Sequence, residues 1–171
     1  MIKVEYDSNN VSKLVSMLIN RKETVATMES CTGGALASEI TNAVGASEVI
    51  HFSAVTYSNE YKIKMGVDAN VIERYSVYSI ETACEMARNI SKFANSDYGI
   101  GITGKINAPD PNNNYGKNDE VYIVIYCANT HDEYRYTMEV ESNITRLANK
   151  QKIVDFIIKK FLNILSLDAV L

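Results

Sequence analysis

A short apolar run that leads into a serine-containing glycine turn is the feature that most constrains this chain. Residues 24–28 precede the block Glu29-Ser30-Cys31-Thr32-Gly33-Gly34, and residues 35–40 then alternate small and apolar side chains. This order predicts a strand, a tight turn and a helix. Two adjacent glycines let a ligand approach the backbone closely, and the first N–H groups of a helix have no intrahelical acceptor. The segment therefore predicts a small nucleophile at the end of a sheet, beside backbone donors for an oxyanion or a phosphate.

Most of the remaining chain alternates between helix and strand patterns. Apolar residues recur at helical spacing in residues 11–19, 83–93 and 144–161, and Ser79 is the expected N-cap of the second of these helices. Strand-forming residues dominate residues 49–58, 98–103, 120–128 and 133–141, and short helices are expected at 59–65 and 70–75. Helices between strands favour parallel pairs with both faces covered, whereas the turn at 129–132 predicts an antiparallel hairpin.

We therefore expect an α/β fold, a three-layer α/β/α sandwich with a mixed, mostly parallel sheet and helices on both faces. Residues 1–171 are expected to form it as a single domain. In such sheets the ligand binds beyond the carboxyl ends of the strands. Three segments fall at such ends, namely Ser30–Gly34, residues 57–62 and Thr103–Gly104. Residues 105–119 form a turn-rich stretch long enough to suspect function, so the sequence predicts one active site at this edge.

Composition and charge exclude several classes of function. The formal net charge is −4 and the isoelectric point is about 5.2, which argues against a surface that coats nucleic acid. No apolar run approaches the roughly 20 residues that span a bilayer, and the N-terminus lacks the pattern of a signal peptide. We therefore expect a cytoplasmic protein with neither a membrane nor nucleic acid as a direct partner.

The cysteines and histidines favour neither a metal site nor a histidine-based triad. Cys31, Cys84 and Cys127 are widely spaced without any C-x-x-C, which is a poor disulfide framework and a poor zinc site and fits a reducing compartment. The two histidines, His51 and His131, fall in strand-like stretches and offer few candidates for a triad. We expect the cysteines to be core thiols.

Five motifs occur in a fixed order along the chain. They are E-S-C-T-G-G at 29–34, V-G-A-S at 44–47, Y-S-N-x-x-K at 57–62, G-V at 66–67 and I-T-G at 102–104. Together they resemble the CinA C-terminal domain, which is the nicotinamide-nucleotide amidase family. The resemblance runs from about residue 10 to about residue 163. Many family members carry a further N-terminal domain that resembles molybdopterin-biosynthesis proteins, so this chain looks like the stand-alone form.

The resemblance implies hydrolysis of the carboxamide of nicotinamide mononucleotide to nicotinate mononucleotide and ammonia. It also implies a homodimer that needs no metal and no organic cofactor. Carried over by motif, Ser30 is the nucleophile and Lys62 its base, with Tyr57 and Thr103 also in the catalytic site. The expected substrate-binding residues are Thr32, Gly33, Gly34, Asn59, Gly104 and Arg146.

Three departures from the family pattern leave alternatives open. Ser142 stands four residues before Arg146, where many relatives have a second arginine, and Ser53-Ala54 replaces a glycine pair. The usual T-G-x-x-G-P-D loop is altered between Thr103 and Asp110. The alternatives are a non-hydrolytic nucleotide-binding or regulatory module, or an amidase for a different small amide.

Individual residues also have simpler interpretations. Ser30 alone is a plausible helix cap, and Lys62 alone is a typical surface lysine. Cys31 is a rival nucleophile, because thiols at helix starts have a lowered pKa.

Overall fold

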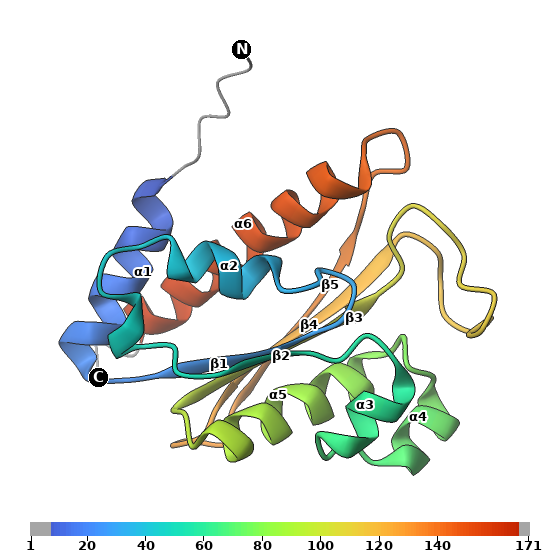
Figure 1. Cartoon of the computed structure of the whole chain (residues 1–171), viewed down its shortest axis with the longest axis horizontal. Helices are drawn as coiled ribbons and strands as arrows, with labels where there is room; N and C mark the ends of the chain where they lie inside the picture. The colour runs from blue at the N-terminus through green and yellow to red at the C-terminus, as the bar shows by residue number, and fades with distance from the viewer. Residues whose placement is uncertain (1–7, 168–171) are drawn as a thin grey trace.

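The computed structural model describes residues 8–167, which form a five-stranded sheet between two layers of helices (Figure 1). The strands are β1 (Val25–Glu29), β2 (Ser53–Val55), β3 (Tyr98–Gly104), β4 (Glu120–Cys127) and β5 (Glu133–Glu139), in the spatial order β2-β1-β3-β4-β5. β1 pairs in parallel with β2 and β3, whereas β4 pairs antiparallel with β3 and β5. Four strands therefore point the same way and only β4 is reversed, which confirms the predicted mixed α/β sheet.

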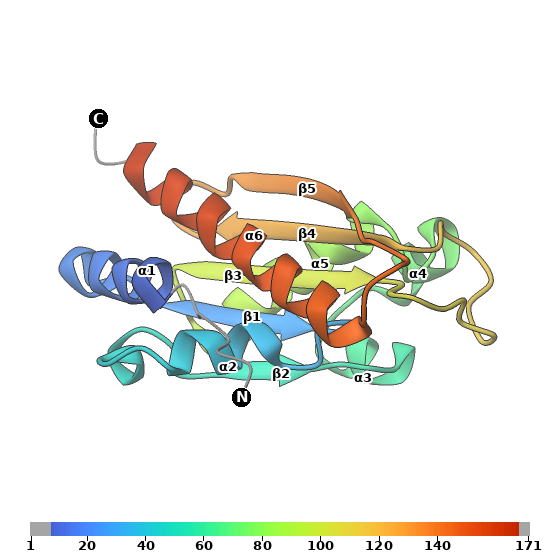
Figure 2. The ribbon, with the colours of Figure 1, turned by 90° about the horizontal axis from the view of Figure 1, so that it is seen from above.

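Helices cover both faces of the sheet, as the three-layer prediction requires. One face carries α1 (Ser8–Arg21), α2 (Ala35–Thr41) and α6 (Arg146–Leu167), and the other carries α3 (Asn59–Lys64), α4 (Ala69–Tyr75) and α5 (Ile80–Ala94) (Figures 1 and 2). The larger apolar core lies between the sheet and the first group, where α1 and α6 bury one stripe each. None of the helices in residues 8–167 is long and apolar enough to span a membrane.

Close packing of α5 on β3 depends on two glycines in the strand. A Cβ atom at Gly99 would lie 2.0 Å from the carbonyl oxygen of Ala87, and one at Gly101 would lie 2.2 Å from that of Ala83. Backbone atoms cannot move aside as a flexible side chain can, so only glycine permits this approach. β3 is consequently buried along its entire length. Its carboxyl end lies beside that of β1, with which it pairs in parallel.

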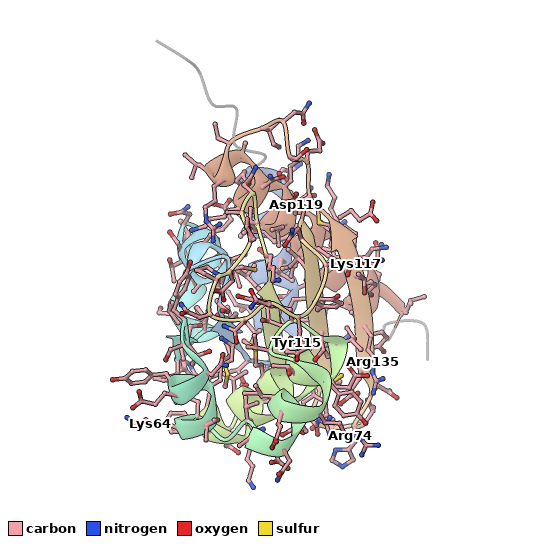
Figure 3. The ribbon with its side chains drawn as sticks, turned by 90° about the vertical axis from the view of Figure 1, so that its right-hand side faces the viewer. Lys64, Arg74, Tyr115, Lys117, Asp119 and Arg135 are labelled. Carbon is pink, nitrogen blue, oxygen red and sulfur yellow. The ribbon has the colours of Figure 1, made fainter. Side chains whose placement is uncertain are left out.

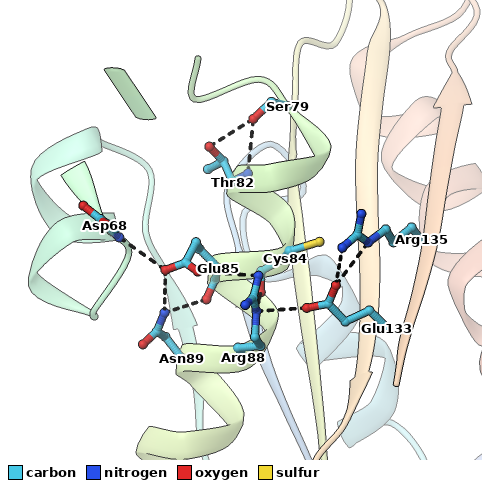
Figure 4. A network of polar contacts seen from close by, with 9 residues as sticks. All are labelled: Asp68, Ser79, Thr82, Cys84, Glu85, Arg88, Asn89, Glu133 and Arg135. Carbon is cyan, nitrogen blue, oxygen red and sulfur yellow. Dashed lines mark hydrogen bonds and ion pairs between the residues drawn. The ribbon is translucent and has the colours of Figure 1, made fainter. Parts of the chain in front are cut away.

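A polar network ties the outer side of α5 to its neighbours (Figure 4). Arg88 of α5 lies 2.9 Å from the carboxylate of Glu133 in β5, which also pairs with Arg135 at 2.6 Å. On the α4 side, the Asp68 backbone N–H donates to Glu85 at 3.4 Å. These contacts fix α5 between the edge strand β5 and the segment that carries α3 and α4.

Several local predictions were wrong in extent. β2 is only three residues long, although residues 49–58 were expected to form a strand. The helix after the glycine turn was expected to run to about Ala43 and to end at Gly45. In the structure α2 ends at Thr41, and Gly45, at φ 87°, precedes a 3₁₀ turn (Ala46–Glu48). The histidines lie outside the strands: His51 follows the 3₁₀ turn, and His131 sits at φ 61° in the hairpin turn. Strand-forming neighbours misled the prediction at His51, whereas His131 lies within the hairpin turn that was predicted at 129–132.

Candidate active site

The structure brings Ser30 and Lys62 together at the carboxyl end of β1. The Lys62 amine donates hydrogen bonds to the Ser30 hydroxyl at 3.0 Å and to the Thr56 carbonyl oxygen at 2.7 Å. Lys62 is only 1% exposed and Ser30 only 6% exposed. A lysine and a serine that are far apart in sequence thus form a buried pair at the sheet edge where a site was predicted.

Helix α3 aims Lys62 inward. The Ser58 side chain caps this short helix by accepting from the Tyr61 N–H, and the Ser58 carbonyl accepts from the Lys62 N–H. The flanking residues Tyr61 and Ile63 are 58% and 43% exposed, so Lys62 alone among these three residues faces the sheet. The Y-S-N-x-x-K spacing therefore places its lysine one helical turn beyond the cap, directed toward β1.

Burial lowers the pKa of Lys62 from its ordinary value of 10.5 to about 8. The two groups that accept from its amine, a hydroxyl and a backbone carbonyl, are both uncharged. Interactions with Cys31 and Asp110 oppose the shift without cancelling it. At pH 7 about one tenth of Lys62 is consequently neutral and able to accept a proton, and this fraction rises to about one half at pH 8.

Glu29 holds the turn that presents Ser30. Its buried carboxylate accepts from the backbone N–H groups of Gly34, Leu36 and Ala37 at 2.9–3.2 Å. It also accepts from the hydroxyls of the two nearby threonines, Thr27 and Thr32. A carboxylate at the start of a helix satisfies the unpaired N–H groups there and complements the helix dipole. Nothing in the sequence pattern indicated this positioning role, although Glu29 begins the E-S-C-T-G-G motif.

This arrangement changes what the rest of the turn offers to a ligand. The Thr32 hydroxyl and the Gly34 N–H are occupied by Glu29, and the Gly33 N–H donates to the Ser30 carbonyl at 3.0 Å. None of these three residues lies in the wall of the adjacent cavity. The Cys31 N–H, by contrast, has no backbone acceptor within residues 8–167, and Cys31 does line the cavity.

A cavity of about 530 Å³ opens beside Ser30. Its wall comes from the nucleophile turn, the start of α3, the residue Tyr78 before α5, the loop after β3 and the start of α6. Five of the residues predicted for the site line it, namely Ser30, Tyr57, Asn59, Gly104 and Arg146. The other lining residues include Tyr78, Lys105, Asp110 and Asn113.

The loop of residues 105–119 crosses the front of the molecule in Figure 3, and most of its residues between Lys105 and Asn113 line one side of the cavity. Asp110 accepts from the Tyr78 hydroxyl at 2.5 Å and from the Asn113 side chain at 2.8 Å. Asn59 donates in turn to Asn113 at 3.1 Å, which ties the loop to α3. The hydrogen bonds from Tyr78 and Asn113 lower the pKa of Asp110. Asparagine and proline content signalled the loop in advance, but nothing in the sequence singled out Tyr78.

Arg146 joins the loop to the opposite rim. Its guanidinium donates to the Ile106 carbonyl oxygen and, at 3.3 Å, to the Tyr57 hydroxyl. Thr103 behaves differently, because its buried hydroxyl donates to the Val77 carbonyl at 2.8 Å and the residue does not line the cavity. The structure therefore gives Thr103 a contact that joins β3 to the segment before α5.

The geometry favours Ser30 over Cys31 as a nucleophile. Burial raises the pKa of the Cys31 thiol to about 12. The thiolate is the reactive form of cysteine, so almost none of it is available near neutral pH. The Lys62 amine bonds to the serine hydroxyl, and the cysteine next to it is a buried thiol of the turn.

Comparison with known proteins assigns the family. The family model described as CinA C-terminal domain matches residues 7–165. The chain belongs to this family. A relative from Clostridium acetobutylicum is 46% identical over 99 residues, and the CinA-like protein of Desulforapulum autotrophicum is 45% identical over 89 residues. These matches cover 57% and 52% of this chain but 24% and 21% of the relatives, so the chain spans about a quarter of the length of these relatives.

Solved structures share the fold of this CinA domain over nearly their full length. A CinA superfamily protein from Klebsiella pneumoniae aligns with a TM-score of 0.85 at 22% identity, covering 95% of this chain and 99% of that one. A CinA superfamily protein from Escherichia coli aligns with a TM-score of 0.84 at 26% identity, covering 96% and 93%. The sheet order and the two helical layers are thus common to proteins of low sequence identity.

Proposed function

We propose that this CinA domain is an amidohydrolase that converts nicotinamide mononucleotide to nicotinate mononucleotide and ammonia. The observation that carries the proposal is the 3.0 Å hydrogen bond between the buried Lys62 amine and the Ser30 hydroxyl beside an open cavity. A serine hydroxyl needs a base to attack a carboxamide, which is a poor electrophile. Membership of the CinA family supports this substrate class.

In the first half of the reaction, the Ser30 oxygen attacks the carboxamide carbon while neutral Lys62 takes the hydroxyl proton. The carbonyl oxygen becomes an oxyanion, and we assign the Cys31 N–H as its donor, because this N–H has no backbone acceptor within residues 8–167 and Cys31 lines the cavity. Protonated Lys62 then donates its proton to the leaving nitrogen. The C–N bond breaks, ammonia departs and an ester remains on Ser30.

In the second half, water attacks the ester and gives its proton to Lys62. The C–O bond to Ser30 breaks, the serine oxygen regains the proton from Lys62, and the carboxylate product leaves. One amine thus serves as base and acid in both halves. A pKa of about 8 suits this exchange, because proton transfer is most effective when the catalytic pKa lies near the working pH.

The cavity suits a nucleotide in size and character. Small-molecule sites usually span roughly 300–1,000 Å³, and this one measures about 530 Å³. Tyr57 and Tyr78 offer aromatic surface in its wall, and Arg146 offers a cation. Aromatic and cationic groups together match a pyridine ring that carries a phosphorylated ribose.

The test is ammonia release from nicotinamide mononucleotide by the wild type, Ser30→Ala, Lys62→Met, Cys31→Ala and Lys64→Met. We expect the first two substitutions to lower kcat by at least about 10²-fold, the usual contribution of an acid–base group. Cys31→Ala tests the rival thiol while keeping the backbone N–H. Lys64→Met, which changes an exposed lysine on the same helix as Lys62, is the matched control and should retain turnover within about threefold. Unchanged turnover in Ser30→Ala would exclude the assigned nucleophile.

The altered loop between Thr103 and Asp110 favours one second candidate, a nucleotide-binding module without hydrolysis. This loop supplies much of the cavity wall, so its changes bear on ligand choice. Calorimetric binding of nicotinamide mononucleotide without ammonia release would support this candidate. Hydrolysis of other small amides in a substrate panel would instead indicate an amidase of different specificity.

A further inference from the structure

Lys105 is a buried cation in the cavity wall that the proposed reaction does not use. It follows β3 directly and is only 4% exposed. Its amine donates to the Gly116 carbonyl oxygen at 3.3 Å and lies 5.0 Å from the centre of the Tyr78 ring. Within residues 8–167, no carboxylate lies within ion-pair distance of this amine.

The contacts of Lys105 do not match its charge. An ammonium group has three donors, and here it has one long hydrogen bond to a neutral acceptor. Burial of a charge is costly unless the charge is paired. The carboxylate of Asp110, which also lines the cavity, already accepts from Tyr78, Asn112 and Asn113.

Arg146 lines the same cavity as Lys105. Its guanidinium donates to the carbonyl oxygen of Ile106, the residue that follows Lys105, and to the neutral Tyr57 hydroxyl. The guanidinium of Arg146 is therefore bonded to the backbone one residue beyond Lys105. Within residues 8–167, Asp110 is the only carboxylate in the cavity wall, and its charge attracts Lys105 without forming a direct ion pair with Lys105 or Arg146. An anion would therefore find two positive groups there that are not engaged in ion pairs.

We propose that Lys105 is the second cation of an anion-binding subsite that it forms with Arg146. The ligand group is a phosphate monoester, which carries close to two negative charges at neutral pH and can accept from both cations. On binding, the Lys105 amine exchanges the Gly116 carbonyl for a phosphate oxygen. This inference rests on the proposed function for the identity of the nucleotide, and it makes Lys105 a specificity-determining residue for phosphorylated substrates.

The kinetic test compares nicotinamide mononucleotide with nicotinamide riboside, which lacks the phosphate. In Lys105→Met we expect KM for the mononucleotide to rise about 10- to 100-fold with kcat within about threefold, as for the loss of a charged hydrogen bond. The value of kcat/KM for the riboside should stay within about twofold, and Lys105→Arg should restore most of the loss. Equal losses on both substrates, or none on the mononucleotide, would overturn the proposal.

The control variant is Lys117→Met, which removes the same charge from the same loop. Lys117 has a side chain that is 77% exposed, pairs with Glu120 at 3.7 Å and does not line the cavity. We expect its kinetic constants to match those of the wild type. A loss in Lys117→Met equal to that in Lys105→Met would mean that net charge, rather than a subsite, produces the effect.

Binding measurements distinguish a failure of this inference from a failure of the proposed function. If the wild type hydrolyses neither compound, the amidase proposal fails, and calorimetry with nicotinamide mononucleotide and with inorganic phosphate still tests the subsite. Weaker binding of both to Lys105→Met than to the wild type and Lys117→Met supports it. Equal binding of both ligands by all three proteins, or no binding by any of them, overturns it.

Discussion

Lys62 imposes a cost on folding that pH should reveal. The unfolded chain holds this lysine in water at its ordinary pKa of 10.5, whereas burial lowers the pKa to about 8 in the folded state. Below pH 8 both states are protonated and the folded state carries the full penalty. Between pH 8 and 10.5 the folded state releases its proton first, so the penalty disappears as pH rises. Each step of one pKa corresponds to about 1.36 kcal/mol, which makes the penalty at pH 7 about 3 kcal/mol.

Lys62→Met isolates this contribution. The substitution removes the penalty of about 3 kcal/mol at pH 7 and also removes two hydrogen bonds of about 1 kcal/mol each. We therefore expect the variant to be about 1 kcal/mol more stable than the wild type at pH 7. At pH 10 about 1 kcal/mol of the penalty remains, so the variant should be about 1 kcal/mol less stable. The difference in unfolding free energy should thus change sign and shift by about 2 kcal/mol.

The assay is urea unfolding of both proteins at pH 7, 8, 9 and 10, with the difference between them as the measured quantity. Taking the difference removes the titration of groups that both proteins share. Lys64→Met is the matched control on α3, because Lys64 has a side chain that is 58% exposed and pairs with Glu60. Its difference from the wild type should stay within about 0.5 kcal/mol at every pH. A flat difference for Lys62→Met would refute the lowered pKa, and with it the account of Lys62 as a base.

Four further predictions follow from the same contacts. kcat/KM for amide hydrolysis should rise about 10-fold from pH 7 to pH 9 and then level off, as neutral Lys62 accumulates; a flat profile would contradict this. Glu29→Gln should lower the unfolding free energy by about 2–4 kcal/mol and reduce kcat, because the NH₂ group of glutamine would face backbone N–H donors that the carboxylate now accepts from. Equal stability of the variant and the wild type in urea would contradict it. Gly101→Ala should cost about 3 kcal/mol by clash with Ala83, seen as a lower Tm. Sedimentation equilibrium should give twice the chain mass of 19.1 kDa if the expected homodimer forms.

The sequence predicted the elements that have strong periodicity and the motif that carries the chemistry. α1, α5 and β3 lie close to their expected positions because apolar spacing and the Ser79 cap determine them locally. β2 was overextended because its length depends on pairing with β1 and not on its own residues. The Ser30–Lys62 contact was anticipated only through family resemblance, since no local rule brings α3 against the nucleophile turn.

The site was predicted incompletely, because a sequence motif does not show which groups its side chains will contact. A motif shows that Thr32, Gly34 and Thr103 are present, but not which acceptor or donor each one meets. Glu29 occupies the first two, and the Val77 carbonyl occupies the third. The reverse holds for Tyr78, which no motif marks and which contacts Asp110 only because the loop folds back.

Reversal of a single strand explains why recognition groups gather over the catalytic pair. β4 runs antiparallel to β3, so residues 105–119 must leave and re-enter the sheet at the same edge. A parallel connection would have to carry the chain to the opposite edge, usually through a helix. The loop is thereby held beside Ser30 with Lys105 at its first position. β5 then ends at this edge as well, which starts α6 with Arg146 facing the loop. The parallel half of the sheet thus supplies the nucleophile and its base, and the antiparallel half supplies the cations that we propose select the ligand.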